Sequence, residues 1–236
     1  MGLTRPNEGG YAMGGLSRHS LRALEAVWND LLALGESVVD SLEKCVLAVR
    51  EGRVELVAEI KEQEEDSDRR EVEIEQEALR ILALFEPVAT DLRRMATVLK
   101  VNRDWERIAD LSLRVARRAR KLVRKHPEIV VPDGIKDLAG AVLEHVRAAQ
   151  GVLTRGDSAA ARQVIADDQK IDDAYRDVRR ELKALAAADP ARLDGWLLVL
   201  SSARNLERIA DHATGIAQTV VFLQEGRIIR HGDETV

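Results

Sequence analysis

The sequence predicts an all-α protein made of two pseudo-symmetric three-helix bundles, and three observations support this prediction. The 236 residues include only 5 prolines and 3% aromatic residues, while 45% are hydrophobic, a composition typical of long helices that pack on one another. Apolar residues recur at helical spacing in six long stretches. The second half of the chain repeats the layout of the first, and internal repetition of this kind fixes the architecture before any single motif does.

The first bundle is expected to span 17–125. An apolar seam at three- and four-residue spacing predicts a helix over roughly 17–50. Gly52 then breaks the pattern, and a second helix follows to about Phe85. Pro87 is suited to the first turn of a helix, so a third helix is expected from there to about Lys125.

The second bundle is expected to span 135–225. It follows the stretch HPEIVVPDG at 126–134, whose two prolines and glycine predict a linker between the halves. Helical spacing then predicts helices over roughly 135–155, 158–187 and 191–225. The glycine-rich residues 1–16 are expected to form a disordered tail, and 226–236 a C-terminal tail.

Acidic residues recur at equivalent positions in the two repeats. A shift of 104 residues aligns the second helix with the fifth, and a shift of 101 aligns the third with the sixth. The aligned acids are Glu64 with Asp168, Asp68 with Asp172, Glu106 with Glu207, and Asp110 with Asp211. Each half therefore carries two helices with an acid-x-x-x-Asp pair on its expected seam, and residues four apart lie on nearly the same helix face.

If these faces meet, four carboxylates converge in each half. Two such charges about 6 Å apart repel by roughly 3 kcal/mol at an effective dielectric constant of about 20, so the arrangement needs arginine, protonation or cations to relieve it. Oxygen ligands suit Mg²⁺, Ca²⁺ or Mn²⁺, and bridging carboxylates also suit clusters of iron or zinc. The alternative is that the acids are solvated surface groups paired with arginines, namely Arg103, Arg107, Arg204 and Arg208.

At these residues the chain resembles the PhoU family of bacterial phosphate-transport accessory and phosphate-signalling proteins. The resemblance covers roughly 17–225 and is carried by PVATDLRRMATVLKVNRDWERIAD in the first half and ARNLERIADHATGIA in the second. It implies two three-helix bundles with multinuclear metal sites at E(D)xxxD motifs. The implied ligands are Glu106 with Asp110 and Glu207 with Asp211, completed by Glu64 with Asp68 and Asp168 with Asp172.

The resemblance also implies a function. Family members dampen the phosphate-starvation response and moderate high-affinity phosphate uptake, through contact with a sensor histidine kinase and the ATPase of a phosphate ABC transporter. Iron, zinc, magnesium and manganese are the metals to be considered. Two departures affect the sites: Arg114 and Gly215 stand where many relatives have Asn, and Trp105 stands where Leu is usual.

Composition and motifs also indicate the compartment of the protein and whether it is an enzyme. One cysteine excludes an intrachain disulfide, which together with the absence of an 18-residue apolar window or a signal peptide favours a cytoplasmic protein. Membrane association is expected to be at most peripheral, through partners. The sequence lacks a nucleophile–base arrangement and a phosphate loop, so we expect no enzyme activity. A homodimer is expected, although no single feature of the sequence shows it.

Two other functions stay open. A carboxylate-bridged di-metal enzyme would need an open coordination position, and the Glu-x-x-His pairs of ferritin-like oxidases are missing. A metal-free helical scaffold would need no ligands at all. The basic residues at 114–125 either dock an acidic partner or anionic lipid, or complement the C-terminal end of their helix and offset the acidic second helix, which is the interpretation we favour. Nucleic acid is not expected because this stretch lacks aromatic residues.

Overall fold

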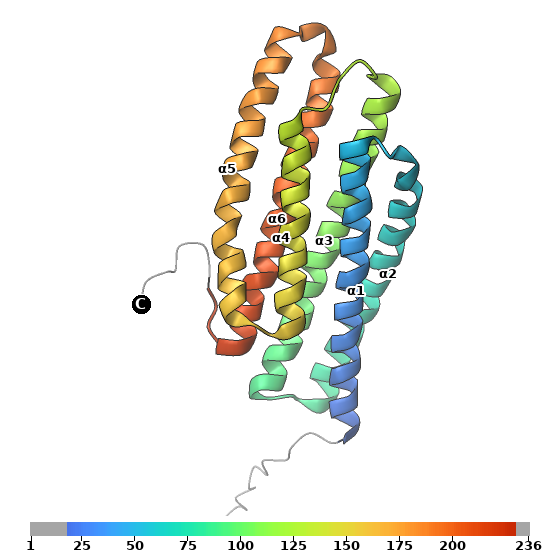
Figure 1. Cartoon of the computed structure of the whole chain (residues 1–236). Helices are drawn as coiled ribbons and strands as arrows, with labels where there is room; N and C mark the ends of the chain where they lie inside the picture. Colours follow the sequence, from blue (N-terminus) through green and yellow to red (C-terminus); the bar gives the residue numbers. More distant parts are fainter. Residues whose placement is uncertain (1–17, 230–236) are drawn as a thin grey trace, which may run out of the picture.

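The computed structural model describes residues 18–229, and within them the secondary structure is helical (Figure 1). Six long helices are joined by short connections: α1 (Arg18–Glu51), α2 (Val57–Phe85), α3 (Ala89–Lys125), α4 (Asp133–Arg155), α5 (Ser158–Ala188) and α6 (Leu193–Glu225). Short 3-10 turns, η1 (Val54–Leu56) and η2 (Pro190–Arg192), precede α2 and α6. The predicted tail at 1–16 and residues 230–236 of the predicted C-terminal tail lie outside the described residues.

Local sequence signals account for most helix ends. Gly156 ends α4 in a left-handed conformation with φ of 64°, which glycine adopts without a steric penalty. Asp157 then caps α5, because its carboxylate accepts a hydrogen bond from the Ala160 amide at 3.0 Å. The expected start of the third helix was wrong: α3 begins at Ala89, after an extended Val88, and Pro87 lies in the connection.

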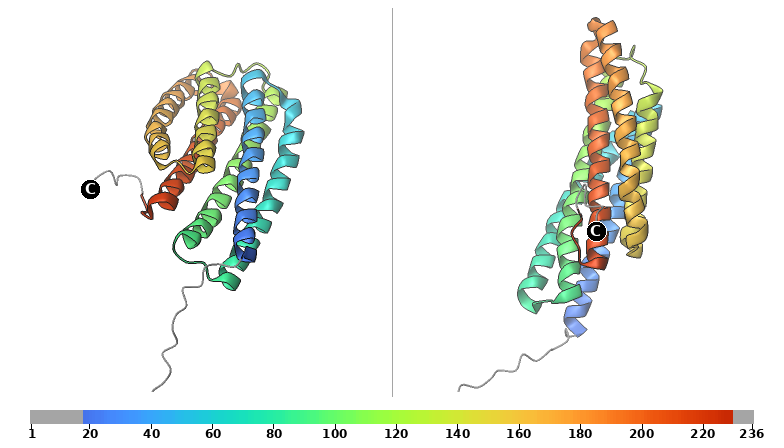
Figure 2. Two further views of the ribbon diagram at one scale, coloured as in Figure 1. Left: turned by 60° about the horizontal axis from the view of Figure 1, so that its bottom comes forward. Right: turned by 90° about the vertical axis from the view of Figure 1, so that its left-hand side faces the viewer.

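The helices form the two bundles that the repeat predicted. Helices α1, α2 and α3 pack on one another, as do α4, α5 and α6. The bundles join where α3 packs against α6 and α1 against α4, which leaves α2 and α5 at the outer edges (Figures 1 and 2). Helices α3 and α6 run in opposite directions, so that Asp104 meets His212 while Lys100 meets Phe222.

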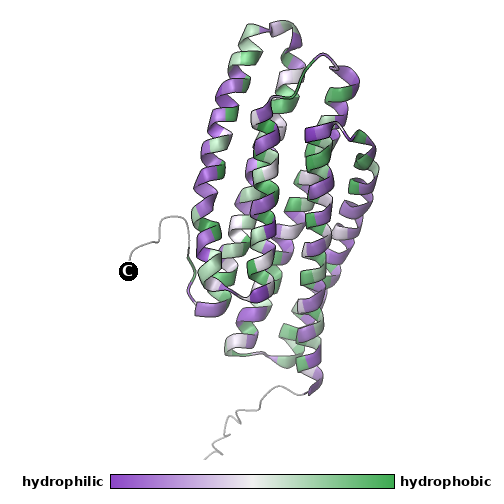
Figure 3. Cartoon of the chain, in the orientation of Figure 1, coloured by the Kyte–Doolittle hydropathy of each residue, from purple (hydrophilic) through white to green (hydrophobic). Residues whose placement is uncertain are grey.

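One continuous hydrophobic core runs through both bundles, and hydrophilic and hydrophobic residues alternate along each helix as expected for helices with one buried face (Figure 3). Its largest fully buried side chain is Trp105, on α3. The indole lies against Gly35 of α1, where an added Cβ would sit 2.9 Å from Trp105 Cε2. The glycine in the predicted seam of the first helix therefore makes room for the tryptophan.

The predicted seams were wrong at some helix ends. Val88 and Leu92 belong to the expected seam of the third helix, yet 73% and 47% of their surfaces are exposed. Leu21 and Leu193 are similarly exposed at the starts of α1 and α6. A periodic stripe drifts around a straight helix, and it predicts an apolar face without showing how far the neighbouring helix extends to cover it.

Candidate metal centre

The four predicted acids of the first repeat lie near one another on the facing sides of α2 and α3. Asp68 and Glu106 line a surface depression of about 460 Å³ together with Arg103 and Arg107. Burial raises the pKa of Glu106, and the negative charges of Asp110 and Asp68 raise it further against the opposing charge of Arg107. The repeat in the sequence therefore predicted correctly that these helix faces meet.

Glu64 belongs to the same group. Burial is the largest cause of its raised pKa, followed by the charge of Asp68, while Asp110 also raises it and Arg117 lowers it. Glu71 was not among the predicted ligands, but it lines the same depression and its pKa is raised by burial and then by Glu75 and Asp68. The signal for Glu71 was its position three residues after Asp68 on the same helix face.

Two arginines already neutralise part of this charge. Arg114 forms a two-point ion pair with Asp110, with nitrogen–oxygen distances of 2.9 and 2.8 Å. Arg107 Nε lies 3.2 Å from Glu106 Oε2. Arg114 stands where many relatives have Asn, and here it is a direct partner of a candidate ligand. Among residues 18–229, no three or more His, Cys, Asp or Glu side chains are arranged to hold a metal as they stand.

The second repeat brings together three of its four predicted acids. Burial raises the pKa of Glu207, followed by the charges of Asp211 and Asp172, while Arg204 and Arg208 lower it. Asp172 Oδ2 also lies 3.7 Å from Arg176 Nη2. These three carboxylates occupy the α5–α6 face that corresponds to the α2–α3 face of the first repeat.

Asp168 has hydrogen-bonding neighbours of its own in the core. It is buried, and its carboxylate accepts a hydrogen bond from Thr214 Oγ1 at 2.9 Å. His145 Nε2 lies 2.8 Å from the same hydroxyl and 3.7 Å from Asp168 Oδ1. His145 is therefore a buried core histidine bonded to a neighbour. Thr214 was missed; the signal for it was a hydroxyl on the seam where the first repeat has Leu113.

Replacing Thr214 by valine is expected to lower the free energy of unfolding by about 1–3 kcal/mol, because it removes the donor to the buried Asp168 carboxylate. Urea denaturation of the full chain measures the change. Thr219→Val is the matched control, since the Thr219 hydroxyl donates only to the Gly215 carbonyl of its own helix, at 2.9 Å. Equal losses in the two variants would contradict the special role of the buried trio.

The raised carboxyl pKa values predict a pH dependence of stability. The folded chain holds protons on Glu64, Glu106 and Glu207 more readily than the unfolded chain does. Their contribution to stability is therefore fully present below the ordinary glutamate pKa of 4.5 and is lost as pH rises through the raised folded values. In chelator, Glu106→Gln with Glu207→Gln should be more stable than the parent chain at about pH 8 and should lose that advantage near about pH 4.

Denaturation midpoints across this pH range test the prediction. The control is Glu62→Gln with Glu73→Gln, which changes the charge by the same amount at two exposed positions of α2. An advantage of the test variant that does not depend on pH, or that the control shares, would contradict the prediction.

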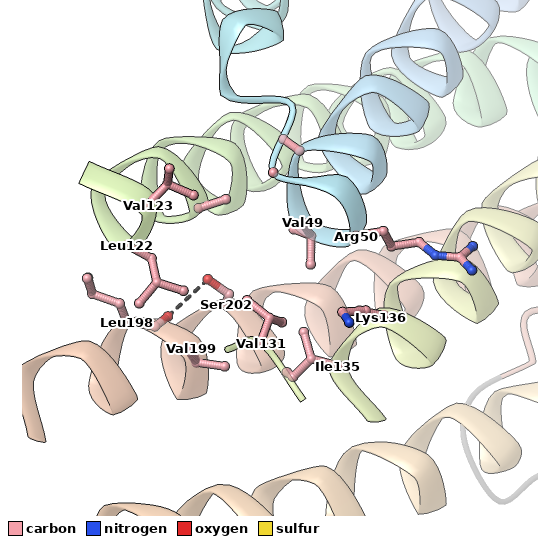
Figure 4. Close-up of a pocket in the computed structure, with 13 residues that line it drawn as sticks. Val49, Arg50, Leu122, Val123, Val131, Ile135, Lys136, Leu198, Val199 and Ser202 are labelled. Atoms are coloured by element: carbon pink, nitrogen blue, oxygen red, sulfur yellow. Dashed lines mark hydrogen bonds between the residues drawn. The ribbon is translucent and has the colours of Figure 1, made fainter. Parts of the chain in front are cut away.

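A separate apolar pocket lies where the two repeats join (Figure 4). Its volume is about 170 Å³, and its walls come from α1, α3, α4 and α6. Val49, Leu122, Ile135 and Val199 are among its lining residues, while Arg50 is the exposed cation among them. No carboxylate lines this pocket, so it is separate from the candidate metal centre.

The chain is thus a helical protein built from two copies of one three-helix module, each with acidic residues between two of its helices. The family model described as "PhoU domain" matches residues 31–119 and again 135–220, and the chain belongs to the PhoU family.

None of the helices in the described part of the chain is long and apolar enough to cross a membrane.

Curated relatives agree with this assignment. A protein of Pseudomonas putida described as "Phosphate-specific transport system accessory protein PhoU homolog" is 34% identical over 211 residues, which cover 88% of this chain and 81% of that protein. A protein of Synechocystis sp. with the same description is 35% identical, over 87% of this chain and 91% of the relative. These descriptions are those of accessory proteins of phosphate transport.

Solved structures confirm the fold. The crystal structure of PhoU from Pseudomonas aeruginosa matches with a TM-score of 0.84 and 31% identity, covering 88% of this chain and 99% of the other. The phosphate transport system regulatory protein PhoU from Streptococcus pneumoniae matches with a TM-score of 0.81 at 20% identity, covering 89% and 99%. The predicted six-helix, two-repeat architecture and the predicted family are both confirmed.

Proposed function

We propose that this chain is a cytoplasmic, metal-binding adaptor that negatively regulates phosphate uptake and phosphate-starvation signalling. Its partners are the ATPase of a phosphate ABC transporter and a sensor histidine kinase. The relatives described as accessory and regulatory proteins of phosphate transport support the regulatory part. Gel filtration with light scattering tests whether the adaptor acts as a homodimer.

The observation that carries the metal-binding part is the grouping of acids in the first repeat. The carboxylates of the four acids repel one another when all are charged; the acids are Glu64, Asp68, Glu106 and Asp110. Burial and this repulsion together raise the pKa values of Glu64 and Glu106. Carboxylates without sulfur or imidazole neighbours suit magnesium or manganese, and bridging carboxylates suit iron or zinc. A bound cation supplies positive charge between α2 and α3.

Binding requires the acids to leave their present partners. Asp110 must exchange the Arg114 guanidinium for the cation, and Glu106 must exchange Arg107. Asp68 is exposed and can turn without disturbing the core. In the second repeat one carboxylate oxygen of Asp168 already accepts the Thr214 hydrogen bond, so we expect a lower affinity for metal there.

Elemental analysis of protein prepared without chelator tests this proposal. Glu106→Gln with Asp110→Asn should lose most of the metal, and Glu207→Gln with Asp211→Asn should lose less. The control, Glu62→Gln, should keep the metal content of the parent chain, since Glu62 is an exposed acid of α2 outside the group. Equal metal content in all variants would exclude the proposed ligands.

A phosphate-starvation reporter tests the regulatory part. Cells lacking the gene should express the reporter in high phosphate, and the parent chain should repress it. The ion pairs of Glu106 and Asp110 with arginine favour a metal-free scaffold as the second candidate. Full repression by a variant that has lost its metal would establish the scaffold function instead.

A further inference from the structure

Two basic depressions adjoin each other on α6. The first, of about 730 Å³, lies between the end of α3 and the start of α6 and is lined by Arg118, Lys121 and Lys125. The second, of about 610 Å³, lies between α5 and α6 and is lined by Arg179 and Lys183, with Arg204 beside Glu207. Both include Leu197 and Ser201 in their linings. We call the two together the basic α6 surface.

Four cations of this surface form no ion pair within the described residues, although Asp194 and Glu207 also line it. Lys121, Lys125, Arg179 and Lys183 are exposed and form no ion pair with any residue of 18–229. Arg118 Nη1 is buried and has no hydrogen-bond acceptor there. Burial lowers the pKa of Arg118, and the nearby charge of Arg114 lowers it further. Some other surface cations are paired across helices, as Arg147 is with Glu43 at 2.6 Å.

Helix ends do not account for this charge. Cations stabilise the C-terminal end of a helix within about its last turn, which explains Arg124 and Lys125 in the last turn of α3. Arg118 and Lys121 lie before that turn. The helix end accounts for part of the basic stretch, and Arg117 offsets the charge of Glu64 on α2, which leaves Arg118 and Lys121 without either role.

The other repeat shows that the fold does not need this surface. At the positions that correspond to Tyr175, Arg179 and Lys183, the first repeat has Glu71, Glu75 and Leu79, so its groove is acidic. The position that corresponds to Lys121 is Phe222, and Lys100 covers the Phe222 ring with its Nζ 4.6 Å from the centroid. At one end of the α3–α6 pair, Lys100 thus covers the Phe222 ring. The other end is an exposed depression lined by cations.

An apolar residue separates the two basic depressions. Half of Leu197 is exposed, at 50%, and Leu193, at the start of the same helix, is 45% exposed. An inorganic anion would contact only the cations. A peptide segment with acids on its flanks and an apolar side chain between them would use both features, as amphipathic helices do in partner grooves.

We propose that the basic α6 surface docks an acidic, amphipathic segment of a partner protein. Acidic side chains of that segment pair with Lys121, Lys125, Arg179 and Lys183, and an apolar side chain packs on Leu197. The inference deepens the proposed function, since it gives the chemistry of the regulatory partner, and it rests on that function only for the existence of such a partner. Metal binding by the first repeat plays no part in it.

Fluorescence anisotropy with the full chain tests the proposal. The probe is a labelled synthetic peptide with glutamates on one helical face and leucines on the other. Lys121→Glu with Arg179→Glu should weaken binding by about tenfold or more, because exposed charge pairs at interfaces set affinity and specificity. Leu197→Ser should weaken it by about fivefold. The control Arg22→Glu with Arg155→Glu makes the same charge change at exposed positions of α1 and α4 and should leave the affinity unchanged.

Three further results would overturn the proposal. The first is equal affinity for a peptide in which serines replace the leucines. The second is equal weakening by the control variant. The third is tighter binding, lost in the charge-reversal variant, to phosphatidylglycerol vesicles or to inorganic polyphosphate. Measurement in chelator with Glu106→Gln and Asp110→Asn keeps the outcome independent of the metal, because these residues lie outside the surface.

Discussion

Replacing Trp105 by alanine is expected to lower the free energy of unfolding by about 3–5 kcal/mol, the range for deleting a large aromatic side chain from a packed core. The indole is fully buried, with 0% exposure, and it lies against Gly35. Its Nε1 has no hydrogen-bond acceptor within the described residues. The loss therefore comes from packing between α1 and α3 and not from a broken hydrogen bond.

Urea denaturation followed by circular dichroism measures this effect. Trp28→Ala is the control, because Trp28 is half-buried and its ring contacts the Arg94 guanidinium at 4.8 Å. It should lose distinctly less than Trp105→Ala. Gly35→Ala should destabilise the parent chain, where the new Cβ would lie 2.9 Å from the indole, and should destabilise a Trp105→Phe background less. Strict additivity of these two changes would contradict direct contact.

The fold could be predicted from the sequence because the helical periodicity and the internal repeat indicate the same architecture. Helical periodicity predicted six helices. The repeat predicted how they group, because two copies of one sequence module pack their helices in the same way. Helix ends were less predictable. Pro87 is equally compatible with a first turn and with a connection, and only the extended conformation of Val88 places the start of α3 at Ala89.

The candidate site was predictable at the level of helix faces but not of side-chain partners. Alignment of the repeats predicted that Glu106 and Glu207 occupy equivalent positions, and both have raised pKa values for the same physical reason. The alignment also equated Asp168 with Glu64. The surroundings of those two side chains differ, because Asp168 is bonded to Thr214, which also contacts His145. Tertiary packing decides which residues of other helices become neighbours, and helical periodicity does not predict it.

The two repeats have diverged in charge more than in backbone. The α2–α3 groove keeps a cluster of acids, whereas the α5–α6 groove has Tyr175 and Arg179 in place of two of them and Lys183 in place of Leu79. One module can therefore serve cation binding and the other partner docking, because each groove is formed by surface residues whose change leaves the shared core intact.

Neutralising the acids of the first repeat is expected to have opposite effects with and without metal. In the fourfold variant, Glu64 and Glu106 become Gln while Asp68 and Asp110 become Asn. In chelator this variant should be more stable than the parent chain by about 1 kcal/mol, since loss of like-charge repulsion outweighs loss of the partly exposed Asp110–Arg114 pair. With metal at about 100 times the Kd of the first repeat, the parent chain should gain about 2.7 kcal/mol and the variant only the smaller gain that the weaker second repeat supplies.

Urea midpoints with and without Mg²⁺, Mn²⁺ or Zn²⁺ measure both effects, and they separate the candidate functions by sign. A surface stabilised by arginine pairs alone predicts that neutralisation lowers stability in chelator, and that metal changes nothing. A metal centre predicts a gain in chelator together with a loss of the metal response. A metal response of undiminished size in the variant would place the cation elsewhere, because the first repeat would then have no charged carboxylate left among Glu64, Asp68, Glu106 and Asp110 to bind it.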